Sequence, residues 1–412
     1  MTEIFLIIFF ISVLLFFLGS GIWVAISMIG VSTIGMMLFT SRPVGDAMAT
    51  TIWGTSSSWT LTALPLFVWM GEILFRTKLS ENLFAGLSPW MQKLPGGLIH
   101  VNVVGCALFA AISGSSAATV ATVGKMSIPE LRKRKYPEKI LLGSLAGSGT
   151  LGLLIPPSII LIIYGVTVQE SIAKLFIAGI IPGIMIALIF MSYVIIWSLI
   201  NKKSMPKYVE NFSFLEKIRK SKQLLPVIIL ISAVIGSIYT GVATATEAAS
   251  LGVVGALILS YFQKSLTIET FKQSLLGATK TSCMIAFILA GSTFLSLAMG
   301  FTGLPRNLAI WIQNMELSPY VLIFVLMIFY IILGMFLDGI SAVVLTMAII
   351  EPMIRQAGFD MIWFGIFLVI VVEMAQITPP VGFNLFVLQG MATVSYTHLR
   401  AHETVLDLVC RL

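Results

Sequence analysis

Charge is scarce in this chain. Only 10% of its 412 residues are Asp, Glu, Lys or Arg, whereas 58% are hydrophobic. Soluble domains carry roughly 25% charged residues, so this composition, with a mean hydropathy of +1.01, excludes a soluble globular protein. The apolar runs are continuous rather than alternating, which argues against a transmembrane β-barrel. The sequence therefore predicts an all-α polytopic membrane protein.

Cysteine and histidine are also rare. The cysteines are Cys106, Cys283 and Cys410, with no C-x-x-C spacing, and His100 is the only histidine before position 398. These residues predict neither a metal centre nor a disulfide framework. The chain also lacks a phosphate loop of the G-x-x-x-x-G-K-S/T type and an H-E-x-x-H motif, which excludes a recognisable ATP motor or zinc hydrolase. We expect no enzyme activity, no catalytic residue and no cofactor.

Basic residues gather in two segments, residues 132–139 and 202–222. The positive-inside rule places both segments in the cytoplasm. Nucleic-acid binding is the competing interpretation, but neither segment has interleaved aromatic residues, so we expect no nucleic-acid partner. The apolar run from Ile4 to Phe17 lacks basic residues before it and an A-x-A site after it, so we expect a retained helix rather than a cleaved signal peptide.

Two double prolines stand in equally apolar surroundings. Pro156-Pro157 and Pro379-Pro380 lie 223 positions apart, and at the same offset Pro129 matches Pro352. A double proline cannot continue an α-helix. Breaks at matching places in two halves of a membrane protein are typical of discontinuous helices around a binding site near the membrane midplane. We therefore predict two inverted repeats, each with a re-entrant hairpin and a Pro-Pro broken helix, as in an elevator-type transporter.

The first predicted hairpin has arms that meet at a small, polar tip, residues 113–116. Its second arm, residues 117–128, is about 18 Å long as a helix, too short to cross a membrane of ~30 Å.

The domain prediction follows from these breaks: an N-terminal repeat (1–200; hairpin about 98–128, broken helix about 140–168), a cytoplasmic linker (201–223), a C-terminal repeat (224–394; hairpin about 320–350, broken helix about 362–390), and a tail (395–412). The tail resembles translated adapter sequence, so we predict a non-native segment in place of a last helix; a short amphipathic tail is the alternative.

The polar groups at the breaks suggest binding sites. A broken helix leaves free backbone carbonyls, and carbonyl and hydroxyl oxygens suit hard cations. We predict one sodium site at Ser113, Ser115, Gly152, Ile155 and Pro157, and a second at Asp338, Gly339, Thr378 and Pro380. The alternative is that the prolines only kink the helices and the small residues only allow close packing.

Substrate binding is predicted at Ser116 and Asn384, although Asn384 could equally cap a helix. Asp338 and Glu373 are ionisable residues inside apolar segments, where such residues are functional candidates by default. They indicate either a proton or ion pathway or a buried structural pair.

At these residues the chain resembles the large membrane subunit of the tripartite ATP-independent periplasmic (TRAP) transporters, the DctM-like family. The resemblance rests on five segments: residues 100–104, 113–115, 155–158, 244–248 and 373–386, the last containing Thr-Pro-Pro-Val-Gly-Phe-Asn. One departure is Ala245, where the family usually has proline.

The resemblance implies a multi-pass protein of the bacterial inner membrane that acts in sodium-driven uptake of an organic acid. It also implies two partners, a small DctQ-like membrane subunit and a soluble DctP-like periplasmic binding protein, and an elevator motion of the domain that holds both hairpins. The alternative is a sodium- or proton-coupled dicarboxylate or other anion carrier that works without a binding protein.

Overall fold

The computed structural model describes residues 3–77, 79–206, 212–222, 224–305, 307, 310, 318–379 and 382–392. All regular secondary structure in these ranges is helical, which confirms the all-α prediction. Four of the described helices are long and apolar enough to cross a membrane, and up to seven spans result if each bent helix pair counts as one. The predicted tail at 395–412 and Pro380 lie outside the described residues.

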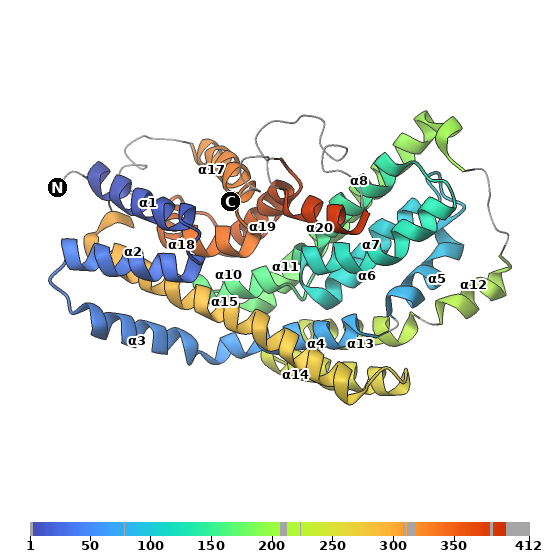
Figure 1. Ribbon diagram of the computed structural model, residues 1–412, viewed down its shortest axis with the longest axis horizontal. Helices are drawn as coiled ribbons and strands as arrows, with labels where there is room; N and C mark the ends of the chain where they lie inside the picture. The colour runs from blue at the N-terminus through green and yellow to red at the C-terminus, as the bar shows by residue number, and fades with distance from the viewer. Residues whose placement is uncertain are drawn as a thin grey trace.

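A first group of helices packs around the 35-residue helix α15. Figure 1 shows α15 running obliquely through the lower half of the molecule, with α2, α3 and α4 beside it and α14 against α4. The members of this first group are α1 (Glu3–Gly19), α2 (Val24–Phe39), α3 (Val44–Ser56), η1 (Trp59–Thr62), α4 (Ala63–Phe75), α13 (Leu225–Tyr239), α14 (Ala245–Phe262) and α15 (Ile268–Thr302).

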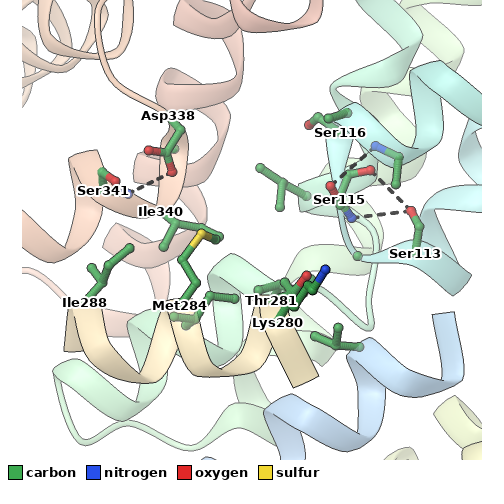
Figure 2. Close-up of a pocket in the computed structure, with 18 of the residues that line it drawn as sticks. Ser113, Ser115, Ser116, Lys280, Thr281, Met284, Ile288, Asp338, Ile340 and Ser341 are labelled. Carbon is green, nitrogen blue, oxygen red and sulfur yellow. Dashed lines mark hydrogen bonds between the residues drawn. The ribbon is translucent and has the colours of Figure 1, made fainter. Parts of the chain in front are cut away.

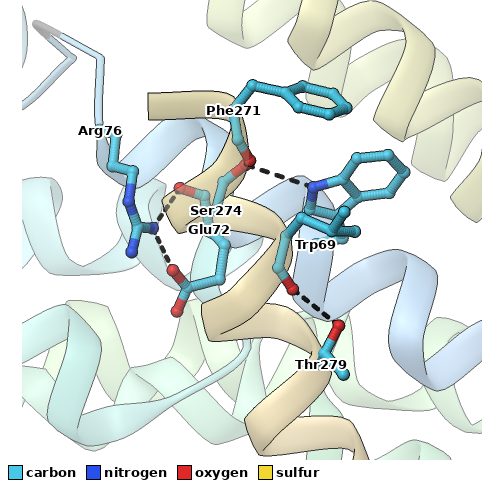
Figure 3. Close-up of polar contacts among 7 residues, drawn as sticks. Trp69, Glu72, Arg76, Phe271, Ser274 and Thr279 are labelled. Atoms are coloured by element: carbon cyan, nitrogen blue, oxygen red, sulfur yellow. Dashed lines mark hydrogen bonds and ion pairs between the residues drawn. The ribbon is translucent and has the colours of Figure 1, made fainter. Parts of the chain in front are cut away.

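Polar contacts fix α4 to α15 in this first group (Figure 3). The indole N–H of Trp69 donates a hydrogen bond of 3.3 Å to the Ser274 hydroxyl. One turn further along α4, Glu72 forms an ion pair with Arg76. A Cβ added to Gly277 of α15 would lie only 2.6 Å from Oε2 of Glu72. The absence of a side chain at residue 277 therefore lets a charged pair fit between two apolar helices.

A second group contains the helices that the sequence predicts as two hairpins and two broken helices. Its members are α6 (Ile99–Ser113), α7 (Ser116–Lys133), α8 (Glu138–Gly149), α9 (Leu151–Leu154), α10 (Ile159–Thr167), α11 (Ile172–Ile200), α17 (Pro319–Gly334), α18 (Gly339–Gln356), α19 (Met361–Gln376) and α20 (Phe383–Ala392). The connectors between the groups include α5 (Leu79–Met91), η2 (Lys202–Ser204) and α12 (Phe214–Ser221). In each hairpin the second arm packs against the other half of the chain, because α7 contacts α20 and α18 contacts α10.

The second arms of both hairpins are longer than the sequence suggests. α7 continues through Pro129 to Lys133 and α18 continues through Pro352 to Gln356, each with 18 residues. A proline removes one helical hydrogen bond, but the turn after each proline carries a buried apolar residue, Leu131 or Ile354, each 0% exposed. Burial of these side chains holds the last turn in place, so each arm is about 27 Å long. The length of about 18 Å expected for the second arm of the first hairpin was therefore wrong, and α18 is one of the four described helices that are long and apolar enough to cross a membrane.

Candidate functional site

The tip of the first hairpin is a short turn between α6 and α7. Gly114 ends α6 with φ +57°, a left-handed conformation that glycine adopts without a Cβ clash. Ser115 is extended, and its hydroxyl accepts the N–H of Ala118 at 3.5 Å, so it caps α7. The polar residues predicted as a tip therefore end one helix and begin the next.

The first double proline separates α9 from α10. Ile155 precedes Pro156 and is extended (φ −77°, ψ 123°), as a residue before proline prefers to be. Ser158 then caps α10, because its hydroxyl accepts the N–H of Leu161 at 3.3 Å. The helix axis bends by 41° across this break. Backbone carbonyls on the α9 side consequently lose their helical partners.

The first tip packs directly on the first break. The N–H of Ile159 donates a hydrogen bond of 3.4 Å to the Gly114 carbonyl. A Cβ on Gly152 would lie 2.6 Å from the Ser115 carbonyl oxygen, and one on Gly114 would lie 3.0 Å from the Pro157 carbonyl oxygen. The two backbones touch because both positions lack a side chain, and the carbonyl of Pro157 faces the tip.

A further hydroxyl, which sequence reasoning missed, lies in this contact. Thr119 is 0% exposed and donates to the Ser115 carbonyl at 2.8 Å, while its Oγ1 lies 2.8 Å from the Ser113 hydroxyl oxygen. Its spacing of four residues from Ser115 on a helix could have indicated it. The tip and break thus gather uncharged carbonyl and hydroxyl oxygens, the ligand type that hard cations prefer.

The second hairpin repeats this arrangement with different side chains. Asp338 is extended and caps α18, because its carboxylate accepts the N–H of Ser341 at 3.1 Å. A Cβ on Gly339 would lie 2.6 Å from Nε2 of Gln376, the last residue of α19. The second tip therefore packs on the end of the helix that precedes the second double proline.

The second break begins immediately after α19. Thr378 is half-buried and its hydroxyl donates to the Met374 carbonyl at 2.7 Å, one turn back. This bond uses the hydroxyl proton and leaves the oxygen lone pairs available. Beyond the break, Gly382 has φ +58° and precedes α20. Pro380, predicted for the second site, lies outside the described residues.

Both tips line one cavity of about 1260 Å³ between the two helix groups. Figure 2 shows the tip of the first hairpin on one side, the tip of the second on the other, and α15 as a third wall. The predicted residues on this lining are Ser113, Ser115, Ser116, Asp338 and Gly339. Lys280 of α15 is the one basic residue among those that line the cavity, although the sequence suggests only a position near a span end.

Other predicted residues lie outside this lining. Gly152, Ile155, Pro157 and Thr378 belong to the breaks behind the tips. Asn384 is 0% exposed on α20, which packs against α7 and α8. Neither Oδ1 nor Nδ2 of Asn384 has a hydrogen-bond partner in the described part of the chain. The structure thus brings Ser113, Ser115, Gly152 and Pro157 together at the first tip, and it places Gly339 beside the end of α19. It does not place Asn384 on the lining of this cavity.

The two intramembrane carboxylates do not pair with each other. Asp338 is exposed and caps its own helix, whereas Glu373 is 4% exposed and accepts from the Ser116 hydroxyl at 2.8 Å. This contact joins the first hairpin to α19. It also places Ser116 between the cavity, which it lines, and the buried carboxylate.

A second cavity, of about 1010 Å³, lies further along α15 between the same two helix groups. Hydroxyl side chains of α3, α15 and the α13–α14 loop line it, together with Glu170 and Glu351. Between the cavities, the Ser292 hydroxyl of α15 donates to the Val344 carbonyl of α18 at 2.6 Å. The second hairpin and α15 are therefore in direct polar contact where the two cavities approach each other.

One solved structure shares this arrangement of helices. The chain is similar to the YdaH transporter of Alcanivorax borkumensis, with a TM-score of 0.61 and 11% sequence identity over 85% of this chain and 82% of that one. At this identity the likeness concerns the fold alone.

Sequence relatives are more informative. The C4-dicarboxylate TRAP transporter large permease protein DctM of Pseudomonas aeruginosa is 33% identical over 353 residues, 85% of this chain and 82% of that protein. The isethionate TRAP transporter permease protein DctMQ of Oleidesulfovibrio alaskensis is 30% identical over 397 residues, 95% of this chain and 61% of that protein. Residues 10–405 match the family described as the tripartite ATP-independent periplasmic transporter, DctM component. The resemblance inferred from the motifs is confirmed: the chain belongs to the DctM family of TRAP transporter large permeases.

Proposed function

We propose that this chain is the large membrane subunit of a sodium-coupled TRAP transporter, which imports an organic acid delivered by a periplasmic binding protein. The observation that carries the proposal is the meeting of two hairpin tips around one cavity, with the first tip packed on a Pro-Pro break and the second on the end of the helix before the other break. Such breaks supply cation ligands from carbonyls while the cavity holds the solute.

A contact pattern common to the two halves supports the proposal of an inverted repeat. The second arm of each predicted hairpin, α7 or α18, packs against the helix beyond the double proline of the other half, α20 or α10. The hairpins and breaks belong to the second helix group, and α15 belongs to the first. We propose that the second group moves along α15 as an elevator, with the two cavities as alternating access routes.

Sodium is proposed to bind at both tip–break contacts. The first site would use the Pro157 and Ser115 carbonyls with the hydroxyls of Ser113 and Thr119, since these oxygens lie together where the tip packs on the break. The second would use the backbone around Gly339 and the Thr378 hydroxyl oxygen. Hard oxygen ligands and the absence of thiolate or imidazole at either contact support an alkali cation.

Partners and substrate class follow from the family. TRAP relatives with permeases of this type are named for C4-dicarboxylate, isethionate and sialic acid, so we propose a small organic acid and a location in the bacterial inner membrane. The name of the relative DctMQ supports a small DctQ-like membrane subunit as one partner. The cavity lining carries one basic residue, Lys280, and two acidic residues, Glu72 and Asp338. We propose that Lys280 is the group that meets the carboxylate of the solute.

Reconstitution tests this function. The chain, the small subunit and the candidate binding protein are placed in proteoliposomes, and uptake of radiolabelled organic acids is measured. We expect uptake that requires both an inward sodium gradient and the binding protein. Equal uptake in potassium-only buffer would contradict sodium coupling. Uptake without the binding protein would favour the alternative carrier that works alone.

A further inference from the structure

The contact between Glu373 and Ser116 is unusual in its hydrogen-bond balance. Both carboxylate oxygens lie 2.8 Å from the same hydroxyl oxygen, and Glu373 and Ser116 are 4% and 2% exposed. An ionised carboxylate offers about four lone-pair sites, but a serine hydroxyl has a single proton to donate. No Lys, Arg or His of the described chain forms an ion pair with Glu373.

A neutral carboxylic acid removes this imbalance. Its O–H donates to Oγ of Ser116, while the serine O–H donates to the other carboxyl oxygen of Glu373. Both distances of 2.8 Å suit such a reciprocal pair. An ionised Glu373 would instead be a buried charge with one neutral donor, which low-dielectric surroundings disfavour strongly.

Other titratable groups around α19 have their own partners or lie far away. Tyr330 of α17 lies 2.6 Å from the Thr346 hydroxyl, and Tyr164 of α10 donates to the Met361 carbonyl at the opposite end of α19. On α18, Asp338 caps the helix and Glu351 pairs with Arg355 near the other end. The remaining groups are exposed or lie near helix ends: Lys174 and Tyr193 on α11, Tyr320 on α17, and Lys125, Glu130, Arg132 and Lys133 on α7.

Water in the cavity has a short route to this carboxyl. Ser116 lines the cavity (Figure 2), whereas Glu373 lies directly behind it. The Ser116 hydroxyl can accept the carboxyl proton and donate its own to a cavity water in the same step. The carboxyl O–H bond then breaks and a proton passes to the cavity water. The carboxylate that remains must be solvated, and water reaches it when the hairpin tip moves away from α19.

We propose that Glu373 is an exchangeable proton-binding site, in which the bound proton holds the tip of the first hairpin to α19. Loss of the proton releases the tip. The proton on Glu373 would then be a bound ion in addition to the proposed sodium. Protonation of Glu373 does not depend on which solute is carried or on which ion drives transport.

Infrared difference spectroscopy of the assembled complex tests the proton directly. We expect a carboxylic-acid carbonyl band at neutral pH that is absent in Glu373→Gln, shifts in Ser116→Ala, and moves when heavy water replaces water. Glu351→Gln is the matched control, because Glu351 forms an ion pair with Arg355 and does not contact Ser116. A spectrum in which Glu373→Gln removes no acid band would overturn the proposal, as would a band that never responds to heavy water.

The pH profile of uptake gives a second readout. Glutamine keeps the size of the side chain and a permanent donor for Ser116, so we expect Glu373→Gln to fold and to keep the contact. Wild-type uptake should fall as pH rises through the titration of Glu373, by at most about tenfold per pH unit, and the Gln variant should have a flatter profile. Identical profiles would overturn the proposal. The infrared band can be measured even if sodium-driven uptake is not observed. Failure of the proposed sodium-coupled function can therefore be told apart from failure of the proton site.

Discussion

Gly152→Ala is the most informative single change at the proposed first sodium site. The new Cβ would lie 2.6 Å from the Ser115 carbonyl oxygen and 2.7 Å from Oγ1 of Thr119, whereas ordinary contacts begin at 3.4 Å. A backbone carbonyl cannot rotate away as a side chain can. The hairpin tip must therefore move from α9 by about 0.8 Å, and the ligand oxygens move with it.

The expected magnitude follows from this displacement. Forcing an extra methyl group into a packed contact costs about 1–3 kcal/mol. If that strain is relieved by separating the tip from the break, sodium binding loses a similar amount, and the sodium concentration for half-maximal uptake rises about 5- to 150-fold. The assay is sodium-dependent uptake by the reconstituted complex, with assembly and thermal stability measured in parallel.

A matched control lies one helix earlier. A Cβ on Gly143 of α8 meets nothing within 4 Å, so Gly143→Ala should leave sodium activation unchanged and stabilise the helix by up to ~1 kcal/mol. If the Gly152→Ala complex fails to assemble, Thr119→Val tests the same contact by removing a hydroxyl without adding volume. Normal sodium activation in a folded Gly152→Ala complex would refute the assignment of this contact as an ion site.

Three further outcomes are expected. Thr378→Val removes a candidate ligand oxygen and should weaken sodium activation about tenfold or more, on the scale of ~1.5–3 kcal/mol for a charge-assisted contact. Thr378→Ser keeps the hydroxyl and should keep sodium activation. Equal sodium activation in the two variants would mean that the double proline only kinks the helix here. Gly339→Ala meets the flexible end of Gln376 rather than a backbone, so its effect on sodium activation should be smaller than that of Gly152→Ala, and an equal or larger effect would contradict this ranking. Single cysteines at Lys135, two residues after α7, and at Gln356, the last residue of α18, should react with an impermeant thiol reagent from opposite faces of the membrane. Labelling of both from one face would exclude inverted repeats.

Local chemistry explains what the sequence predicts well. The tips and breaks depend on a left-handed glycine, an N-cap serine or aspartate, and residues that precede proline, all of which act within a few positions. These signals locate the starts of α7, α10 and α18, whereas the predicted ends at about 128 and 350 fall short of the ends of α7 and α18 at Lys133 and Gln356. The helices α3 and α5 were not anticipated, because both carry polar residues among their apolar ones.

Long-range contacts explain what the sequence does not predict. Ser116 and Glu373 are 257 residues apart, and no local pattern connects them. The continuation of α7 through Pro129 depends on burial of Leu131 against neighbouring helices, which overrides the helix-breaking tendency of proline. Asn384 was predicted beside the substrate, but the packing of α20 on α7 and α8 places it away from the cavity lining.

The most direct test of sodium coupling is to ask whether the solute itself moves sodium. Proteoliposomes containing the complete complex are prepared with equal sodium on both sides, and radioactive sodium entry is followed after the loaded binding protein is added outside. The account predicts solute-dependent sodium entry that is strongly reduced in Gly152→Ala and preserved in Gly143→Ala. Solute uptake without any accompanying sodium entry would contradict it.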